Sequence, residues 1–203
     1  MARVLILFAH PALERSRVQA RMVRHAAHLD GITFRDLYQL YPDFEINIKK
    51  EQQLLLEHDF IIWQHPFYWY SAPPLLKQWL DLVLEHNWAY GSHGNALTGK
   101  YVFNAISAGA SQPVYTHAGR NRFTVREFLV PFEQTARLCK MEYLPPFVVH
   151  GTHRITDSDA DFYAVQYEQL LIAIVNNRLS PAQLGAAAYL NDLLPIPQSL
   201  QSS

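Results

Sequence analysis

The sequence predicts an α/β fold in which a parallel β-sheet forms the middle layer and helices cover both of its faces. Apolar runs rich in β-favouring residues recur at residues 4–8, 32–37, 60–63, 101–106 and 143–149. Segments whose apolar residues recur with helical spacing separate these runs. Strands that alternate with helices pair in parallel through right-handed crossovers, so we expect a three-layer sandwich.

The first half of the chain follows this alternation closely. The first strand is a continuous apolar run, as is typical of a strand that is buried on both faces. Ser16 can cap the helix that follows, in which apolar residues recur from Val18 to Leu29. A second helix over residues 49–58 leads into the third strand.

The second half continues the pattern. Pro74 suits the first turn of a third helix, whose apolar residues repeat every three to four positions. We expect the fourth helix over residues 126–138 and the last over residues 161–175. Five strands in this arrangement favour a flavodoxin-like topology with the strand order 2-1-3-4-5.

Length and composition are those of one compact domain. The chain has 203 residues, of which 49% are apolar and 17% charged. These proportions allow a large core and argue against disorder. We expect a single domain over residues 1–180 and a C-terminal tail over residues 181–203, which packs on a neighbour or frays.

Charge and cysteine usage exclude several classes of protein. A formal net charge of −1 leaves no global positive field, which disfavours a nucleic-acid partner. The single cysteine, Cys139, cannot form a disulfide within the chain, and this fits a reducing compartment. No stretch approaches the ~18 to 20 apolar residues of a membrane span, and the first apolar run is too short for a signal peptide. We expect a cytoplasmic protein that meets a membrane only through a partner.

Ligands of open parallel sheets lie beyond the carboxyl ends of the strands. Three loops are expected there, at residues 10–16, 65–74 and 107–122. We therefore expect the chemistry of this protein at the place where these loops meet.

The first loop is suited to a phosphate group. It leads into a helix whose N-terminal amides attract anions, and the side chains that can add to them are His10, Ser16, Arg17 and Gln19. The loop lacks the G-x-G-x-x-G pattern, so a monophosphate fits better than a dinucleotide bound in the Rossmann manner. The alternative is an ordinary capped helix on the surface.

The second loop carries four consecutive aromatic residues after a proline: Pro66, Phe67, Tyr68, Trp69 and Tyr70. Aromatic residues exposed together mark a surface that binds a flat apolar ligand or another chain. The alternative is that they pack beneath the next helix.

The third loop begins with small residues that let a ligand edge approach the backbone, namely Ser107, Ala108, Gly109 and Ala110. Tyr115 and His117 follow. A phenol and an imidazole can both donate hydrogen bonds to an oxygen on which negative charge develops.

Other patterns in the sequence do not carry a function. Residues 94–100 have the spacing of a P-loop, but no Ser or Thr follows Lys100 and the segment precedes a strand. The ten histidines lack the paired spacing of a helical metal site, so we expect no metal. No G-x-S-x-G elbow supports a hydrolase.

At these loops the sequence resembles the flavodoxin-like NAD(P)H:quinone oxidoreductases, most closely the cytoplasmic ancillary subunits of glutathione-regulated potassium efflux antiporters. The resemblance spans most of residues 3–150. Its most specific stretches are Ala9-His10-Pro11, Asp36-Leu37-Tyr38, Tyr41-Pro42-Asp43-Phe44, Gln64-His65-Pro66, Trp69-Tyr70-Ser71, Pro74-Leu75-Leu76-Lys77 and residues 94–100.

The resemblance implies FMN as cofactor, with FAD as the alternative, and NAD(P)H as co-substrate. It implies that the flavin phosphate end is held by His10, Ser16, Arg17 and Gln19. It implies that the isoalloxazine ring is lined by Pro66, Phe67, Tyr68 and Trp69, and its polar edge by Ser107, Ala108, Gly109 and Ala110. Tyr115 resembles the family's charge-stabilising tyrosine, and His117 is the nearest candidate for the histidine with which the family pairs it.

The function implied is two-electron transfer of a hydride from NAD(P)H, through flavin N5, to a quinone-like acceptor. The resemblance also points to a homodimer that completes each site across its interface, and to a membrane potassium efflux antiporter as a partner, with the protein then peripheral at the cytoplasmic face of the inner membrane. Residues 107–110 depart from the family's Thr-Thr-Gly-Gly by one hydroxyl and one glycine. The alternative is therefore a weakly or non-enzymatic module that activates a potassium/proton antiporter.

Overall fold

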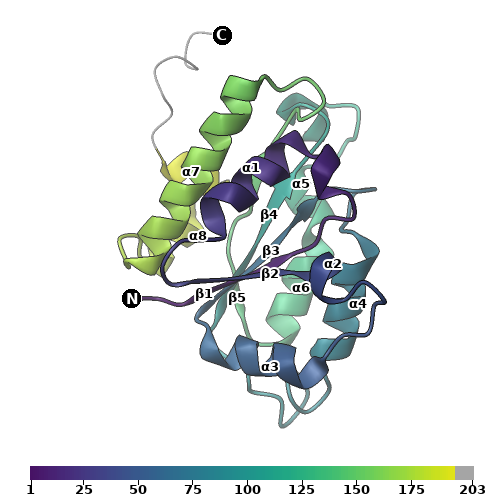
Figure 1. The fold of residues 1–203 in the computed structure, drawn as a ribbon, viewed down its shortest axis with the longest axis vertical. Helices are drawn as coiled ribbons and strands as arrows, with labels where there is room; N and C mark the ends of the chain where they lie inside the picture. The colour runs from purple at the N-terminus through teal and green to yellow at the C-terminus, as the bar shows by residue number, and fades with distance from the viewer. Residues whose placement is uncertain (195–203) are drawn as a thin grey trace.

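The computed structural model describes residues 1–194 and confirms the predicted three layers (Figure 1). The strands of its parallel sheet are β1 (Val4–Phe8), β2 (Ile32–Asp36), β3 (Phe60–Pro66), β4 (Tyr101–Ser107), β5 (Glu142–Tyr143) and β6 (Phe147–Val149). Their order is β2-β1-β3-β4-β5, with β6 also paired to β4, so the predicted strand order is confirmed.

Helices cover both faces of this sheet. They are α1 (Arg17–Ala26), α2 (Leu37–Leu40), α3 (Ile48–Glu57), α4 (Pro74–Val83), α5 (Val125–Phe128), α6 (Val130–Leu138), α7 (Asp157–Val175) and α8 (Pro181–Ala186), with short 3₁₀ turns η1 (Leu13–Arg15), η2 (Gln112–Tyr115) and η3 (Leu190–Leu193). Helices α1 and α7 pack side by side on one face, and α3, α4 and α6 lie on the other (Figure 1).

Strand β1 shows why a central strand can be apolar throughout. Successive side chains of a strand point to opposite faces of a sheet. Val4, Ile6 and Phe8 belong to the core beneath α1 and α7. Leu5 and Leu7 belong to the core beneath α3, α4 and α6. Because helices cover both faces, every side chain of β1 is buried, which favours apolar residues along the whole strand.

The predicted fifth strand, residues 143–149, is divided in the structure. Tyr101 of β4 pairs with Glu142 of β5, whereas Ala105 pairs with Phe147 of β6, so the edge carries one extra residue. Pro145 and Pro146 lie in the break. Proline has no N–H to donate to the ladder, which interrupts pairing at this point.

Two helix boundaries also differ from the prediction. The fourth helix is broken at Leu129 into α5 and α6, with Pro131 in the first turn of α6, because proline removes a hydrogen bond from a helix interior. The last helix begins at Asp157 rather than at residue 161, because the Thr156 side chain accepts the Asp159 N–H and caps it earlier.

The described part of the predicted tail packs on the same chain. Leu184 and Leu190 are buried in the core beneath α7. Asn191 Oδ1 accepts the backbone N–H of Val148 at 2.8 Å, which ties η3 to β6. The rest of that tail, residues 195–203, lies outside the described residues, and the domain boundary at residue 180 stays a prediction.

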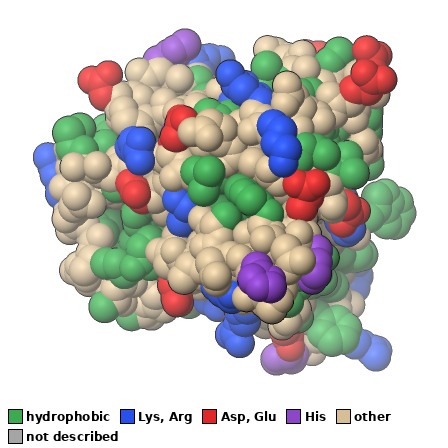
Figure 2. Space-filling model, turned by 90° about the horizontal axis from the view of Figure 1, so that it is seen from below, with side chains coloured by type: hydrophobic (Ala, Val, Ile, Leu, Met, Phe, Trp, Pro, Cys, Tyr) green, Lys and Arg blue, Asp and Glu red, His purple; other side chains and the backbone are tan. Residues whose placement is uncertain are grey.

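Two further observations concern the helices and the surface charges of residues 1–194. None of the helices there is both long and apolar enough to cross a bilayer. On the face viewed from the end at which α3 lies, basic and acidic side chains are interspersed instead of gathered by sign (Figure 2).

Candidate functional site

The loops after β1, β3 and β4 meet at one edge of the sheet, where the segment after β6 joins them. They enclose two adjacent cavities. The α1 cavity, of about 260 Å³, is lined by His10, Arg15, Ser16, Arg17, Val18, Pro66, Phe67, Tyr68, Ser107, Gly109, Thr152 and His153. The aromatic cavity, of about 280 Å³, is lined by Phe67, Trp69, Tyr70, Gly109, Ala110, Tyr115, Arg120, Asn121 and His153.

The α1 cavity offers hydrogen-bond donors. Ser16 caps α1 by accepting the backbone N–H of Gln19 at 3.1 Å, and the first-turn amides of a helix have no partner within it. His10 Nδ1 accepts the backbone N–H of Ala12 at 3.1 Å, so the imidazole proton is on Nε2. Burial lowers the pKa of His10, which keeps the ring neutral.

Two arginines give this cavity its positive charge. The Arg17 guanidinium lies 2.8 Å from Asp157 of α7, and Asp157 also pairs with Arg21 at 2.8 Å. Arg15, which the sequence did not single out, forms no ion pair within residues 1–194. A positive charge beside a helix N-terminus is the usual setting for a bound anion.

Gln19 does not line the cavity, which corrects its predicted contact with a phosphate. Its side chain is fully buried. The Nε2 atom donates to the His65 carbonyl at 3.2 Å and to Ser107 Oγ at 3.1 Å. Gln19 faces the sheet because it lies one turn along the buried side of α1, so it fixes α1 to β3 and β4.

The β3 loop exposes its aromatic residues unequally. Phe67 is buried, whereas the Trp69 side chain is 93% exposed. Trp69 and Tyr70 have φ values of 50° and 63°, and Ser71 N–H returns to the Tyr68 carbonyl at 2.9 Å. This tight turn costs on the order of 1–3 kcal/mol for each left-handed residue, and such strain is concentrated at functional sites. The turn directs the Trp69 side chain away from the core.

The remaining aromatic residues form a packed cluster. Tyr70 stacks on Phe128 of α5 at a ring separation of 4.8 Å. Phe67 meets Tyr115 edge to face at 5.9 Å. The sequence left open the alternative that these aromatic residues pack under a neighbouring element. This alternative applies to Phe67 and Tyr70 but not to Trp69.

The β4 loop lies between the two cavities and lines part of each. Ser107 and Gly109 line the α1 cavity and Ala110 lines the aromatic one. Ala108 is fully buried and lines neither, which corrects its predicted contact with a ligand. A Cβ atom at Gly109 would lie 2.2 Å from His153 Nε2, so a larger residue here would displace that ring from the cavity wall.

Tyr115 and His117 are not brought together. Tyr115 is buried and lines the aromatic cavity, and burial raises the pKa of its hydroxyl, so it stays protonated. His117 lies outside both cavities, with Nδ1 3.2 Å from the Arg122 carbonyl and Nε2 3.8 Å from Glu127. Its predicted pairing with Tyr115 is therefore not found, because Thr116 and His117 follow the end of η2 on an exposed loop.

Sequence reasoning missed Arg15, Thr152 and His153. The last two lie in the segment after β6, whose backbone is tied to the β4 loop through Gly151 N–H to the Ala110 carbonyl at 2.8 Å. The signal was available, because β6 is parallel to the other strands and its carboxyl end meets the same sheet edge.

The arrangement joins a cationic, donor-rich end to an aromatic end across a strip of small residues. This combination fits a ligand that has an anionic group and a planar ring. Within residues 1–194, no three His, Cys, Asp or Glu side chains lie together in positions to hold a metal ion.

Comparisons with known proteins agree with this fold. A family model described as a flavodoxin-like fold matches residues 2–171. The glutathione-regulated potassium-efflux system ancillary protein KefF of Klebsiella aerogenes is 43% identical over 169 residues, which cover 83% of this chain and 94% of the relative.

Two solved structures are also similar. General stress protein 14 from Treponema denticola, in complex with FMN, is 39% identical with a TM-score of 0.79, and the match covers 86% of this chain and 98% of that one. An NADPH-quinone reductase from P. pentosaceus is 36% identical with a TM-score of 0.74, over 82% and 96% of the two chains. The chain therefore belongs to the family of proteins with a flavodoxin-like fold.

Proposed function

We propose that this protein is an FMN-dependent NAD(P)H:quinone oxidoreductase. The observation that carries the proposal is the meeting of the cationic α1 cavity and the aromatic cavity, which share Phe67, Gly109 and His153. The relatives support it, because one was solved with FMN and another is named an NADPH-quinone reductase.

The α1 cavity fits the phosphate of FMN. His10 Nε2–H can donate to a phosphate oxygen because its other nitrogen is already used by the Ala12 amide. Arg15 and Arg17 supply the countercharge, and the first turn of α1 supplies backbone donors. FMN suits this cavity because it carries a single phosphate, and one cationic cavity with hydrogen-bond donors is enough to hold it.

The aromatic cavity and the β4 loop fit the ring. Ser107 Oγ accepts the Gln19 amide, which leaves its own proton free to donate. The Tyr115 hydroxyl is protonated near neutral pH and can donate to an oxygen at the polar edge of the ring. When bound, the flavin supplies the redox chemistry, accepting a hydride from NAD(P)H and passing it to a quinone.

The test is the visible spectrum of the purified protein. We expect a yellow protein, or a colourless one that binds added FMN with a 1:1 end point, and bleaching by NADPH without oxygen. Added quinone should then restore the colour. Absence of flavin binding in titrations of the folded protein would reject the proposed enzymatic activity.

A second proposed role is activation of a membrane potassium efflux antiporter from its cytoplasmic side. The support is the similarity to KefF over 83% of this chain. The two roles are compatible, because a redox site can lie on a subunit that also binds a transporter.

This second role is tested with a glutathione-regulated potassium efflux antiporter, the kind of system to which KefF is an ancillary protein. We expect the two proteins to copurify, and Tyr115→Phe to abolish quinone turnover while antiporter activation persists. Loss of activation together with turnover would instead make the redox reaction the source of the effect. Failure to copurify in any state would reject the role.

A further inference from the structure

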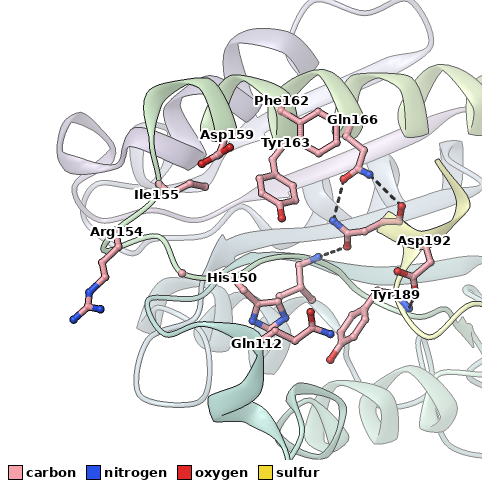
Figure 3. Close-up of a pocket in the computed structure, with 13 residues that line it drawn as sticks. Gln112, His150, Arg154, Ile155, Asp159, Phe162, Tyr163, Gln166, Tyr189 and Asp192 are labelled. Atoms are coloured by element: carbon pink, nitrogen blue, oxygen red, sulfur yellow. Dashed lines mark hydrogen bonds between the residues drawn. The ribbon is translucent and has the colours of Figure 1, made fainter. Parts of the chain in front are cut away.

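A third cavity lies on the other side of Tyr115. Its volume is about 560 Å³, and it is bounded by the end of β6, one side of α7 and η3 (Figure 3). The His150 ring separates it from the candidate redox site, since its centre lies 5.6 Å from that of Tyr115. We call it the α7 cavity. Its volume is in the usual range for sites that bind small molecules.

Much of this cavity is bounded by aromatic rings. Phe162 and Tyr163 come from α7, Tyr189 from the segment before η3, and His150 from the end of β6. His150 and Tyr189 are nearly perpendicular at 5.9 Å. In Figure 3 the Tyr163 ring extends from α7 toward His150 and Tyr189. Rings in this arrangement offer both faces and edges to a flat ligand.

The cavity is held in shape by a closed hydrogen-bond network. Gln166 Nε2 donates to the Asn191 carbonyl at 3.1 Å, and Asn191 Nδ2 donates to Gln166 Oε1 at 3.2 Å (Figure 3). Asn191 also accepts the Val148 amide. These groups are satisfied within the protein, so a ligand meets preformed walls.

His150 is the one polar ring there whose nitrogen atoms lack partners. Both nitrogens are buried without a hydrogen bond within residues 1–194. Burial lowers the pKa of His150 to about 4, so the ring is neutral near pH 7. Buried polar atoms are seldom left unpaired, which marks this place as one that a ligand or water completes.

The charges around the cavity are mainly negative. Asp159 and Asp192 line it, and neither forms an ion pair within residues 1–194. Each carboxylate lies near a tyrosine and contributes to the raised pKa of its hydroxyl, in Tyr163 and Tyr189 respectively, after the larger effect of burial. Arg154 also lines the cavity, but it is exposed and its side chain extends away from the other labelled residues in Figure 3.

We propose that the α7 cavity binds a small aromatic ammonium compound, a planar ring that carries an alkylammonium group. The aromatic walls accept the ring and attract the cation through their faces. Asp159 and Asp192 supply the opposite charge at the rim. This preference is opposite to that of the α1 cavity, where arginines favour an anion. The proposal does not depend on the redox function.

The test compares two probes that share a ring and differ in charge, tryptamine and indole-3-acetate, by titration calorimetry. We expect tryptamine to bind at least about tenfold more tightly than the acid, a difference of the size expected when attraction is replaced by repulsion at a partly buried site. Equal affinity for both probes, or no binding of tryptamine up to about 5 mM, a limit near the weakest measurable affinities, would overturn the proposal.

Variants then locate the binding. Asp159→Asn with Asp192→Asn should weaken tryptamine about fivefold or more. Tyr163→Leu should do the same through loss of the ring, and Tyr163→Phe should have little effect. Asp157→Asn is the matched control, because Asp157 lies in the same turn of α7 but pairs with Arg17 and does not line the cavity. Thermal unfolding checks that each variant is folded.

A variant truncated after Leu194 is the last control. It is needed because residues 195–203 continue directly from the segment that carries Asp192. We expect the same tryptamine affinity as in the full chain. Binding that appears only in the shortened chain would identify those nine residues as the occupant and overturn the proposal.

Discussion

Glu51 of α3 is a charged side chain that is fully buried beneath the sheet. Its Oε1 accepts hydrogen bonds from the Arg35 guanidinium and, at 2.6 Å, from the Tyr41 hydroxyl. Its Oε2 accepts from Trp79 Nε1 at 3.1 Å. The carboxylate thus joins β2, α3 and α4. A buried ion pair adds little net stability, but removing one partner leaves the other charge uncompensated.

Glu51→Ala is therefore expected to lower the free energy of unfolding by about 3–5 kcal/mol, because the Arg35 charge stays buried without its partner. Urea titration followed by tryptophan fluorescence measures the loss. Glu57→Ala, at the end of the same helix, should cost less than about 1 kcal/mol, because within residues 1–194 its side chain bonds only to Gln53. Similar losses in both variants would contradict the role assigned to Glu51.

The buried His65 ring is held in its neutral form by hydrogen bonds at both of its nitrogen atoms. Tyr143 donates to Asn104 Oδ1 at 2.6 Å, which orients the Asn104 amide toward His65 Nε2 at 3.0 Å. The Nδ1 proton is then donated to the Pro66 carbonyl at 2.9 Å. Burial lowers the pKa of His65 from its usual 6.5 to about 4.

Acid should therefore destabilise the protein. The unfolded chain takes up a proton on His65 first, so the contribution is complete above about pH 6.5 and is lost as the pH falls toward 4. We expect His65 to account for about 3 kcal/mol of the difference between those limits. Urea midpoints from pH 7 to pH 4.5 measure it.

The controls for this pH dependence are two histidine variants. His65→Gln should be less stable at pH 7 but should show a flatter pH profile. His93→Gln, at an exposed site, should keep the profile of the parent protein. A profile that is equally steep in the His65 variant would show that other groups cause the acid sensitivity.

At the scale of elements, the contact between α1 and α7 governs the cationic end of the candidate site. Asp157 at the start of α7 holds both Arg17 and Arg21, and Asp161 one turn later holds Arg21 alone. All of these groups lie at the surface of the helix pair. A phosphate at the start of α1 must therefore share Arg17 with Asp157.

Asp157→Asn is expected to raise FMN affinity about two- to fivefold, because it removes a negative charge that competes for the Arg17 guanidinium. Quenching of flavin fluorescence during titration measures this. Asp161→Asn removes a carboxylate from the same face without touching Arg17 and should leave the affinity unchanged. An equal gain in both variants would indicate a general charge effect.

At the scale of the whole molecule, Trp69 is the most exposed aromatic side chain of the described residues. The strained turn keeps it outside the core, beside the aromatic cavity. A second copy of the chain would cover it and complete the site, as the homodimer expected from the resemblance requires. This assembly stays a prediction.

We expect the protein to sediment as a dimer, and Trp69→Glu to shift it toward monomer at micromolar concentration with unchanged thermal stability. Loss of a buried aromatic anchor commonly weakens an interface by about 2 kcal/mol or more. Leu56→Glu, at an exposed apolar position on α3, is the control and should remain dimeric. A monomeric parent protein would exclude the homodimer.

The elements were predictable because their signals are local. Apolar runs such as residues 4–8 predicted buried strands, their alternation with helices predicted parallel pairing, and the flavodoxin-like topology that five strands suggested gave the strand order. The divided edge strand had a local signal in the proline interruption at Pro145, and the broken fourth helix had one in Pro131, which the prediction did not consider. The loops that carry His10, Ser16, Trp69 and Tyr115 were identified in the same way.

The fold class and the sheet edge at which we expect the site could be inferred from the sequence, because the periodicity that marks strands and helices depends on residues close together along the chain. Which side chains meet at that edge was decided by the tertiary structure. Gln19 turned inward, His117 stayed outside and His153 arrived from the segment after β6. Such contacts join residues from distant segments, and their distances are set only when the layers pack.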